Sequence, residues 1–443
     1  MLCLEIEMNT RAPTLGFDFG TTNSTVALAD PGGAVRSVSF PLFGRGRPTA
    51  RSILFFDPDE QEFAGHRPEP FAGNPAIERY EHVGGEGRLV LSPKSWLAAR
   101  SFDATMVFGH RFDLEHLVGA VVAHMRARTR EEFGVDARRV VAGRPVHFAR
   151  GEGDEDDDFA EVRLRRAFAV AGIEDVTFEY EPIGAAYAYE QRLSDDELIL
   201  IGDFGGGTSD FCLLAVGPSY RGASREERRD SILGTGGVGR AGDAFDARII
   251  RNVVAPRLGQ GSERRGVFGD RFPIPGWIYR HLEKWHRLSM LKAPDMMRRL
   301  HRIQRAAVES EQLEALLHIV EQDLGFALYR AVEGTKRRLS SRPEAKLLFH
   351  DGPVALDADV RRTDFEAWIG PELAEIEGAV DGLMESTRTT VEEVDRVFLT
   401  GGSSFVPAVR RVFEDRFGAH RIADGEELTS VARGLALRAA EAA

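Results

Sequence analysis

Apolar and polar residues alternate along two separate stretches of the chain, and each pattern predicts a β-hairpin. In residues 14–29, apolar residues occupy every second position up to Gly20, and the apolar pattern resumes after a short polar turn. In residues 198–216, an apolar run leads to Asp203 and a glycine turn at 205–207, and a second apolar strand follows. The same strand, turn and strand layout therefore occurs twice.

Strands and helices alternate between and after these two hairpins. Apolar residues have helical spacing in residues 112–133 and 162–171, and strand patterns are found in residues 139–146 and 175–179. Such alternation is typical of an α/β lobe in which helices cover a sheet. Residues 277–339 have the three- and four-residue apolar spacing of helices.

A third glycine turn, at residues 400–403, lies near the end of the chain. The strand pattern of residues 396–399 leads into it, and helices are expected at about 407–417 and 430–440. A glycine turn between a strand and a helix presents backbone N–H groups to a ligand such as a nucleoside. Taken alone, this turn is weak evidence for a site.

Size and charge favour two lobes and exclude some classes of partner. The chain has 443 residues, of which 43% are hydrophobic, and a single core stops growing near ~250–300 residues. The net charge of -13 and the pI of about 5.5 argue against nucleic acid or an anionic membrane as the main partner. The expected partner is a protein, and the oligomeric state is left open.

Cysteine usage and hydropathy indicate a cytoplasmic protein. Cys3 and Cys212 are far apart and predict neither a disulfide scaffold nor a zinc site. The first eleven residues lack a basic segment followed by an apolar run, and no stretch approaches the ~20 apolar residues of a membrane helix. The reducing cytoplasm is the expected location.

The two hairpin turns have the composition of phosphate-binding loops. Glycine-rich turns leave backbone N–H groups free to surround phosphate oxygens. The turn residues are Gly20, Thr21, Thr22, Asn23, Gly205, Gly206, Gly207 and Thr208. Neither turn is a Walker A loop, because a strand and not a helix follows it. A plain β-hairpin is the ordinary reading of either turn alone, but two matched turns favour a phosphate gripped from two sides.

Carboxylates accompany the turns at positions suited to a metal ion. Asp18 and Asp203 stand just before the two turns, where they can hold a hydrated magnesium ion beside a triphosphate. Glu181 stands at a strand-to-helix junction, where it can orient water, although acids at helix starts are common. The acidic run 154–158 is expected to be a solvated loop or helix start, and the four histidines of residues 281–318 are not expected to bind a metal.

Four motifs together resemble those of DnaK-type heat-shock chaperones of the Hsp70 family. They are FDFGTTNS at 17–24, EPIGAA at 181–186, DFGGGTSD at 203–210 and LTGGS at 399–403. Residues 140–148 are similar to the family's strand with its switch proline, and residues 241–246 to its second-lobe glycine segment. The resemblance is to the YegD-like members, which have the nucleotide-binding domain only.

The resemblance implies an actin-like ATPase fold with two ribonuclease-H-like lobes and an ATP cleft between them. Lobe I is expected at 1–192, and lobe II at 193–394, with a helical subdomain at about 260–340. Residues 395–443 are expected to contribute the final glycine turn and closing helices, and no peptide-binding domain is expected.

The resemblance also implies roles for individual residues. Asp18, Lys94, Glu181, Asp203 and Thr208 would be catalytic, and Asp18, Asp203 and Asp210 would serve Mg²⁺, largely through water. Lys94 would neutralise charge on the γ-phosphate. Besides the two hairpin turns, the expected nucleotide contacts are Gly242, Glu333, Lys336, Arg337, Ser340, Gly401, Gly402 and Ser403. Phe405 replaces the family's adenine-stacking arginine; it can still stack but has no charge.

These features lead to one main hypothesis and three alternatives. The main one is hydrolysis of ATP to ADP and phosphate with Mg²⁺, potassium being a further candidate ion, coupled to a protein partner or client through lobe closure. A nucleotide-binding scaffold or regulatory protein with little turnover is the first alternative. A small-molecule kinase and an actin-type polymer are the others.

Overall fold

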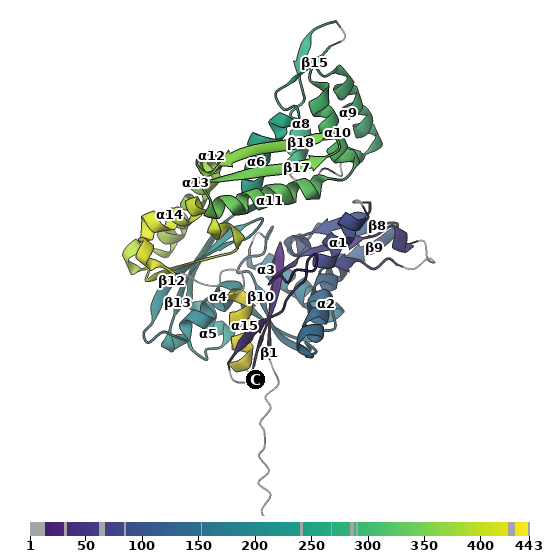
Figure 1. Cartoon of the computed structure of the whole chain (residues 1–443). Helices are drawn as coiled ribbons and strands as arrows, with labels where there is room; N and C mark the ends of the chain where they lie inside the picture. Colours follow the sequence, from purple (N-terminus) through teal and green to yellow (C-terminus); the bar gives the residue numbers. More distant parts are fainter. Residues whose placement is uncertain are drawn as a thin grey trace, which may run out of the picture.

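Two mixed β-sheets, each covered by helices, form the body of the protein (Figure 1). Residues from both sheets line a cleft. The computed structural model describes residues 14–30, 33–61, 67–83, 86–151, 153–239, 242–266, 268–283, 288, 291–423 and 430–441. The fold is the α/β, actin-like ATPase fold that the resemblance implies.

The first sheet contains the first predicted hairpin. Its strands are β1 (Thr14–Phe19), β2 (Asn23–Ala29), β3 (Val35–Ser37), β4 (Ala50–Arg51), β10 (Arg139–Arg144) and β11 (Asp175–Tyr180). They follow the order β11-β10-β1-β2-β3, with β4 beside β2. Strand β1 is antiparallel to β2 and parallel to β10, so the carboxyl ends of β1 and β10 lie at the same edge of the sheet.

Alternation along β1 directs its side chains to two different helical layers. Phe17 and Phe19 are fully buried in a core that includes α2 (Leu114–Phe133) and α3 (Asp154–Val170). On the opposite face, Gly16 admits α15 (Ser430–Glu441) so closely that a Cβ there would lie 2.3 Å from the Ala432 carbonyl oxygen. Helix α15 also packs against α4 (Glu181–Glu190). The last helix of the chain is thus part of the first lobe's core.

The second sheet contains the second predicted hairpin. Its strands are β12 (Glu197–Phe204), β13 (Ser209–Val216), β14 (Ile232–Val238), β19 (Arg396–Thr400) and β20 (Ile422–Ala423), in the order β14-β13-β12-β19-β20. The helices around this sheet are α5 (Arg225–Asp230), α6 (Gly242–Ile249), α12 (Arg362–Trp368), α13 (Gly370–Thr387) and α14 (Pro407–Phe417). Strand β19, which leads into the third glycine turn, is parallel to β12.

A smaller group of elements extends the first lobe beside the cleft. It comprises the strands β5 (Ile53–Phe56), β6 (Phe71–Ala72), β7 (Arg88–Leu91), β8 (Ala104–Val107) and β9 (His110–Asp113) and the helix α1 (Asn74–His82). Apolar residues of β5 and α1 cluster with Phe326, which belongs to the other lobe.

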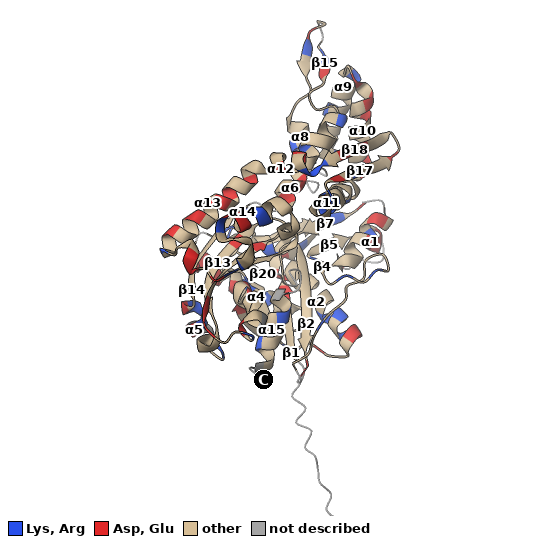
Figure 2. Ribbon diagram, turned by 60° about the vertical axis from the view of Figure 1, so that its left-hand side comes forward, with Lys and Arg blue, Asp and Glu red and all other residues tan. Residues whose placement is uncertain are grey.

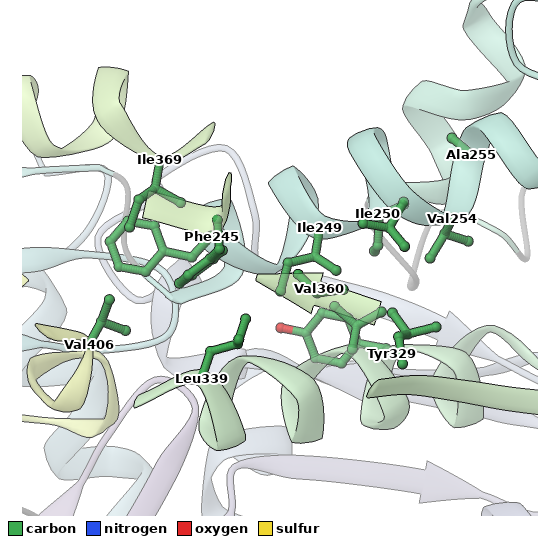
Figure 3. Packing of buried hydrophobic residues seen from close by; sticks show 14 of the residues in the cluster. Phe245, Ile249, Ile250, Val254, Ala255, Tyr329, Leu339, Val360, Ile369 and Val406 are labelled. Atoms are coloured by element: carbon green, nitrogen blue, oxygen red, sulfur yellow. The ribbon is translucent and has the colours of Figure 1, made fainter. Parts of the chain in front are cut away.

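The helical block predicted at 277–339 is divided into several helices. The elements of this part are α7 (Ala255–Arg257), β15 (Glu263–Arg265), β16 (Arg271–Pro273), α8 (Trp277–Leu282), α9 (Pro294–Ala306), α10 (Ser310–Glu321), α11 (Gly325–Ser341), β17 (Glu344–Asp351) and β18 (Val354–Arg361). Figure 3 shows Tyr329 and Leu339 of α11 packed beside Ile249 at the end of α6. This buried contact joins α11 to α6.

Candidate functional site

All three glycine turns line one cleft, although about 190 residues of sequence separate each from the next. The cleft has a volume of about 1070 Å³, and its walls include residues from both sheets and from α11. Every site residue predicted from the sequence lies in its lining. The tertiary structure therefore brings the predicted residues together.

The two hairpin turns face each other across the cleft. In both hairpins the last residue of the first strand pairs with the first residues of the second, Phe19 with Ser24 and Phe204 with Ser209, so each turn is tight. A Cβ at Gly206 would lie only 2.2 Å from Oγ1 of Thr22. Because any side chain would collide there, glycine lets the two turns approach from opposite lobes.

Carboxylates gather below the turns at the ends of the central strands. Burial, followed by the charge of Glu181, raises the pKa of Asp18 to about 8, and burial raises the pKa of Asp210 to about 7. Burial also raises the pKa of Asp203. Hydroxyl groups hold two of them in place: Thr400 donates to Asp203 Oδ1 at 2.8 Å, and Thr208 to Asp210 Oδ2 at 2.8 Å.

One lysine lies among these carboxylates. Lys94 belongs to a short 3-10 helix, Pro93–Trp96, and its side chain is 5% exposed. Its Nζ donates to Oε1 of Glu181 at 2.6 Å, and it lowers the pKa values of Asp18 and Asp203 without returning them to the ordinary range. Lys94 therefore does not offset the cost of ionising these carboxylates together. A hydrated divalent cation fits this donor set, since Mg²⁺ prefers carboxylate and water oxygens.

Helix α11 forms the opposite end of the cleft. Its residues Glu333, Lys336, Arg337 and Ser340 line the cleft as predicted. Lys336 Nζ donates to Asp246 Oδ2 at 2.7 Å and to the Gly242 carbonyl at 3.1 Å, so the lysine joins α11 to the start of α6. The aromatic side chain of Phe405, 47% exposed, lies in the cleft lining beside the third glycine turn.

Sequence reasoning did not identify the buried polar cluster behind Lys336. The Tyr329 hydroxyl lies 2.9 Å from Asp243 Oδ1 and 3.0 Å from Asp246 Oδ2. Burial raises the pKa of Asp246 to about 6, and its Oδ1 has no hydrogen-bond partner among the described residues. The spacing of Asp243 and Asp246, one helical turn apart, was the only signal of this cluster in the sequence.

The acidic run 154–158 begins helix α3, where negative charge favours the helix dipole. Asp157 is buried and accepts a hydrogen bond from the Phe148 backbone N–H at 2.6 Å, and its Oδ2 lies 2.7 Å from His147 Nδ1. Asp157, Asp154 and His147 have possible ligand atoms within 4.8 Å of one another. Because Asp157 is already engaged in fixing residues 147–148, we assign it a structural role.

The described histidines of the helical region make local contacts. His301 pairs with Glu321 at 3.1 Å, and His318 with Asp351 at 2.7 Å. The Nδ1 atom of His281 lies 2.9 Å from the Trp277 carbonyl. His286 lies outside the described residues. None of the described helices is both long enough and apolar enough to cross a membrane.

The comparison with known proteins agrees with this arrangement. The model of the family described as "Hsp70 protein" matches residues 320–441. The DnaK chaperone of Thermosipho melanesiensis is 22% identical over 428 residues, which cover 96% of this chain and 59% of that protein. The DnaK chaperone of Deinococcus proteolyticus is 23% identical over 437 residues, 97% of this chain and again 59% of the relative. The chain thus spans about three fifths of the length of the relatives it matches. This chain is therefore similar to DnaK chaperones along almost its whole length, and to the family described as "Hsp70 protein" in its C-terminal part.

Proposed function

We propose that this protein binds ATP with Mg²⁺ in the cleft and hydrolyses it to ADP and phosphate. One observation carries the proposal. Two glycine turns face each other in the cleft, and beside them lies a cluster of carboxylates with one buried lysine, Lys94, paired to Glu181. The relatives are named as DnaK chaperones, which agrees with the resemblance from which an ATP site is expected. The cleft volume of about 1070 Å³ accommodates a ligand of nucleotide size.

The lining residues suggest how the nucleotide lies. The adenosine would occupy the end formed by α11 and the third glycine turn, where Phe405 offers an aromatic face for stacking. The phosphates would lie between the two hairpin turns, whose backbone N–H groups and threonine hydroxyls are suited to their oxygens. The γ-phosphate would then point toward Lys94 and Glu181.

Hydrolysis requires a positioned water and a group that accepts its proton. Water would attack the γ-phosphorus, the bond to the β-phosphate oxygen would break, and ADP would leave with that oxygen. A carboxylate of the cluster would accept the proton, and Asp210, with a pKa of about 7, is matched to neutral pH. Lys94 would stabilise the charge that develops on the transferred group. Bound Mg²⁺ would supply further charge neutralisation at the phosphates.

Contacts across the cleft mouth suggest how nucleotide state is coupled to lobe closure. Tyr80 of α1 packs edge-on against Phe326 of α11 with ring centroids 5.9 Å apart, and its hydroxyl donates to the Asp323 carbonyl at 3.1 Å. Arg330 pairs with Glu81 across the same gap. We infer that nucleotide binding stabilises these contacts and thereby alters the surface offered to a protein partner.

Single-turnover ATP hydrolysis with Mg²⁺ and K⁺, together with calorimetric titration of ATP and ADP, tests the proposal. Asp203→Asn and Thr208→Ala should reduce turnover about 100-fold or more, since each removes a group at the reacting end. Asp158→Asn is the matched control, because Asp158 is exposed and lies outside the cleft lining.

Equal effects of the three substitutions would refute the site assignment. Tight ATP binding without turnover in the unchanged protein would refute hydrolysis and favour a nucleotide-binding scaffold. Absence of binding would refute the proposal altogether.

A further inference from the structure

Positive charge is concentrated in one part of an acidic protein. Residues 257–306 contain twelve Lys or Arg and four Asp or Glu. The rest of the chain contains 45 Lys or Arg and 66 Asp or Glu, so the net charge of -13 conceals a strong local excess of cations. Within this stretch, the strands near residues 263–273 and the helix at 294–306 extend farthest from the two sheets (Figures 1 and 2).

Two elements of this region form a continuous structure, which we call the basic arm: the hairpin β15–β16 and helix α9. The strands pair from Glu263 with Pro273 to Arg265 with Arg271. The Val308 backbone N–H, just beyond α9, donates to the Glu263 carbonyl at 2.8 Å and so joins the helix end to the hairpin. Backbone hydrogen bonds therefore hold the hairpin together and join it to the end of α9.

Three arginines of the arm are exposed and lack a partner among the described residues, whereas Arg271 and Arg298 form ion pairs within the arm. Leu300 and Ile303 bury one face of α9, while Arg302 and Arg305, one turn apart, are exposed on another. Among the described residues, Arg302, Arg305 and Arg265 of β15 have side chains without an ion-pair or hydrogen-bond partner. Unpaired guanidinium groups held on ordered backbone are available for carboxylates, which they bind in a bidentate manner.

The arm also exposes large apolar side chains. Phe268, in the turn of the hairpin, is 93% exposed, and Phe272 is 44% exposed. The guanidinium of Arg264 lies over the Phe272 ring, 5.4 Å from its centroid. Exposed aromatic residues beside arginines have the composition that is enriched at the centres of protein–protein interfaces.

We propose that the basic arm docks an acidic segment of a partner protein. Arg265, Arg302 and Arg305 pair with carboxylates of the segment, and Phe268 provides its apolar contact. A short acidic segment needs only the arm, whereas a polynucleotide or a bilayer extends past it and meets the acidic remainder of the chain. Charge complementarity therefore favours a protein segment. No residue of α9 or of the hairpin lines the cleft, so this surface is independent of the proposed nucleotide site.

Fluorescence anisotropy with the full chain tests the proposal. The probe is a labelled peptide that alternates Glu with Leu, and the control peptide has Gln in place of every Glu. The Glu peptide should bind, and its affinity should fall with added salt because exposed charges are screened within about 8–10 Å. The Gln peptide should bind at least about tenfold more weakly.

Charge-reversed variants locate the binding surface. Arg302→Glu with Arg305→Glu should weaken binding of the Glu peptide about tenfold or more, and Phe268→Ser several-fold. The control pair Arg130→Glu with Arg166→Glu reverses two exposed charges on the first lobe and should leave peptide affinity unchanged. Calorimetric titration of ATP should be the same for the unchanged protein and all variants, which also verifies that they fold.

The proposal is overturned if the arm variant binds the peptide as tightly as the unchanged protein, or if both charge-reversed pairs weaken binding equally. It is also overturned if single-stranded DNA or phosphatidylserine vesicles bind through Arg302 and Arg305 while the Glu peptide does not. A failure to bind ATP would refute the nucleotide proposal alone and leave the arm untouched.

Discussion

Replacing Asp18 by asparagine is expected to stabilise the nucleotide-free protein at alkaline pH. The pKa of Asp18 is about 8 in the folded protein, whereas its ordinary value is 3.8. Between these values the folded state retains a proton that the unfolded chain has lost. The contribution of Asp18 to the free energy of unfolding therefore has its full value below about pH 4. It falls as the pH rises and is lost once the pH passes about 8.

The size of the effect follows from the shift. A shift of about 4 pKa units corresponds to roughly 6 kcal/mol at most, at 1.36 kcal/mol per unit. Asp18 is only partly buried, and Lys94 partly compensates its charge, so we expect on the order of 3 kcal/mol. Asparagine resembles the protonated acid in shape and has no charge to desolvate. Asp18→Asn should therefore match the unchanged protein in acid and exceed its stability at about pH 8.5.

Urea unfolding followed by circular dichroism, with a chelator present, measures this difference at several pH values between about 5.5 and 8.5. Asp415→Asn is the control, because Asp415 is exposed and should show no pH-dependent change in relative stability. A difference between Asp18→Asn and the unchanged protein that stays constant with pH would refute the reasoning. So would a loss of stability in the variant at the alkaline end. Because hydrolysis should be lost in the same variant, the prediction describes a carboxylate retained for function at a cost in stability.

Three further substitutions test other parts of the structure. Phe326→Ala removes the ring that packs on Tyr80 across the cleft mouth and should speed release of fluorescent ADP about tenfold in stopped-flow measurements; an unchanged rate would contradict the inferred closure. Glu190→Gln leaves the buried Arg228 without its carboxylate partner, now 2.6 Å away, and should lower the free energy of unfolding by about 3 kcal/mol, whereas an apolar replacement of both residues should recover most of that loss in urea unfolding. Phe405→Ala should weaken ATP binding several-fold by calorimetry, because the stacking face is lost, and equal affinity would show that the ring does not contact the base.

Local structure was predictable wherever a residue pattern determines it. The two hairpins were expected because period-two apolar strands flank glycine turns, and both occur where predicted. Boundaries were less accurate. The helix predicted at 162–171 begins at Asp154, since acidic side chains in the first turn favour its dipole. The predicted helical block 277–339 contains several helices, because apolar spacing alone does not show where a chain turns.

Some residues of the candidate site could be predicted from local sequence, and others could not. Asp18 and Asp203 could be selected from the sequence because each precedes a glycine turn, and these features are adjacent along the chain. Lys94 was identified only through the family resemblance, since nothing in its immediate neighbours indicates a buried ion pair with Glu181. Asp246 was not selected as a site residue, because its role depends on contacts with α11, more than 80 residues away.

The sequence by itself determined the repeated hairpins, the chemistry of their turns and the resemblance to DnaK-type chaperones. Only the tertiary structure decided that the three turns share one cleft, that Gly206 lies against Thr22, and that uncommitted arginines gather on one arm. The physical reason is the separation along the chain of the residues that interact. Backbone conformation and turn chemistry depend on neighbouring residues, whereas burial, raised pKa values and charge clusters arise from residues that folding brings together from distant parts of the chain.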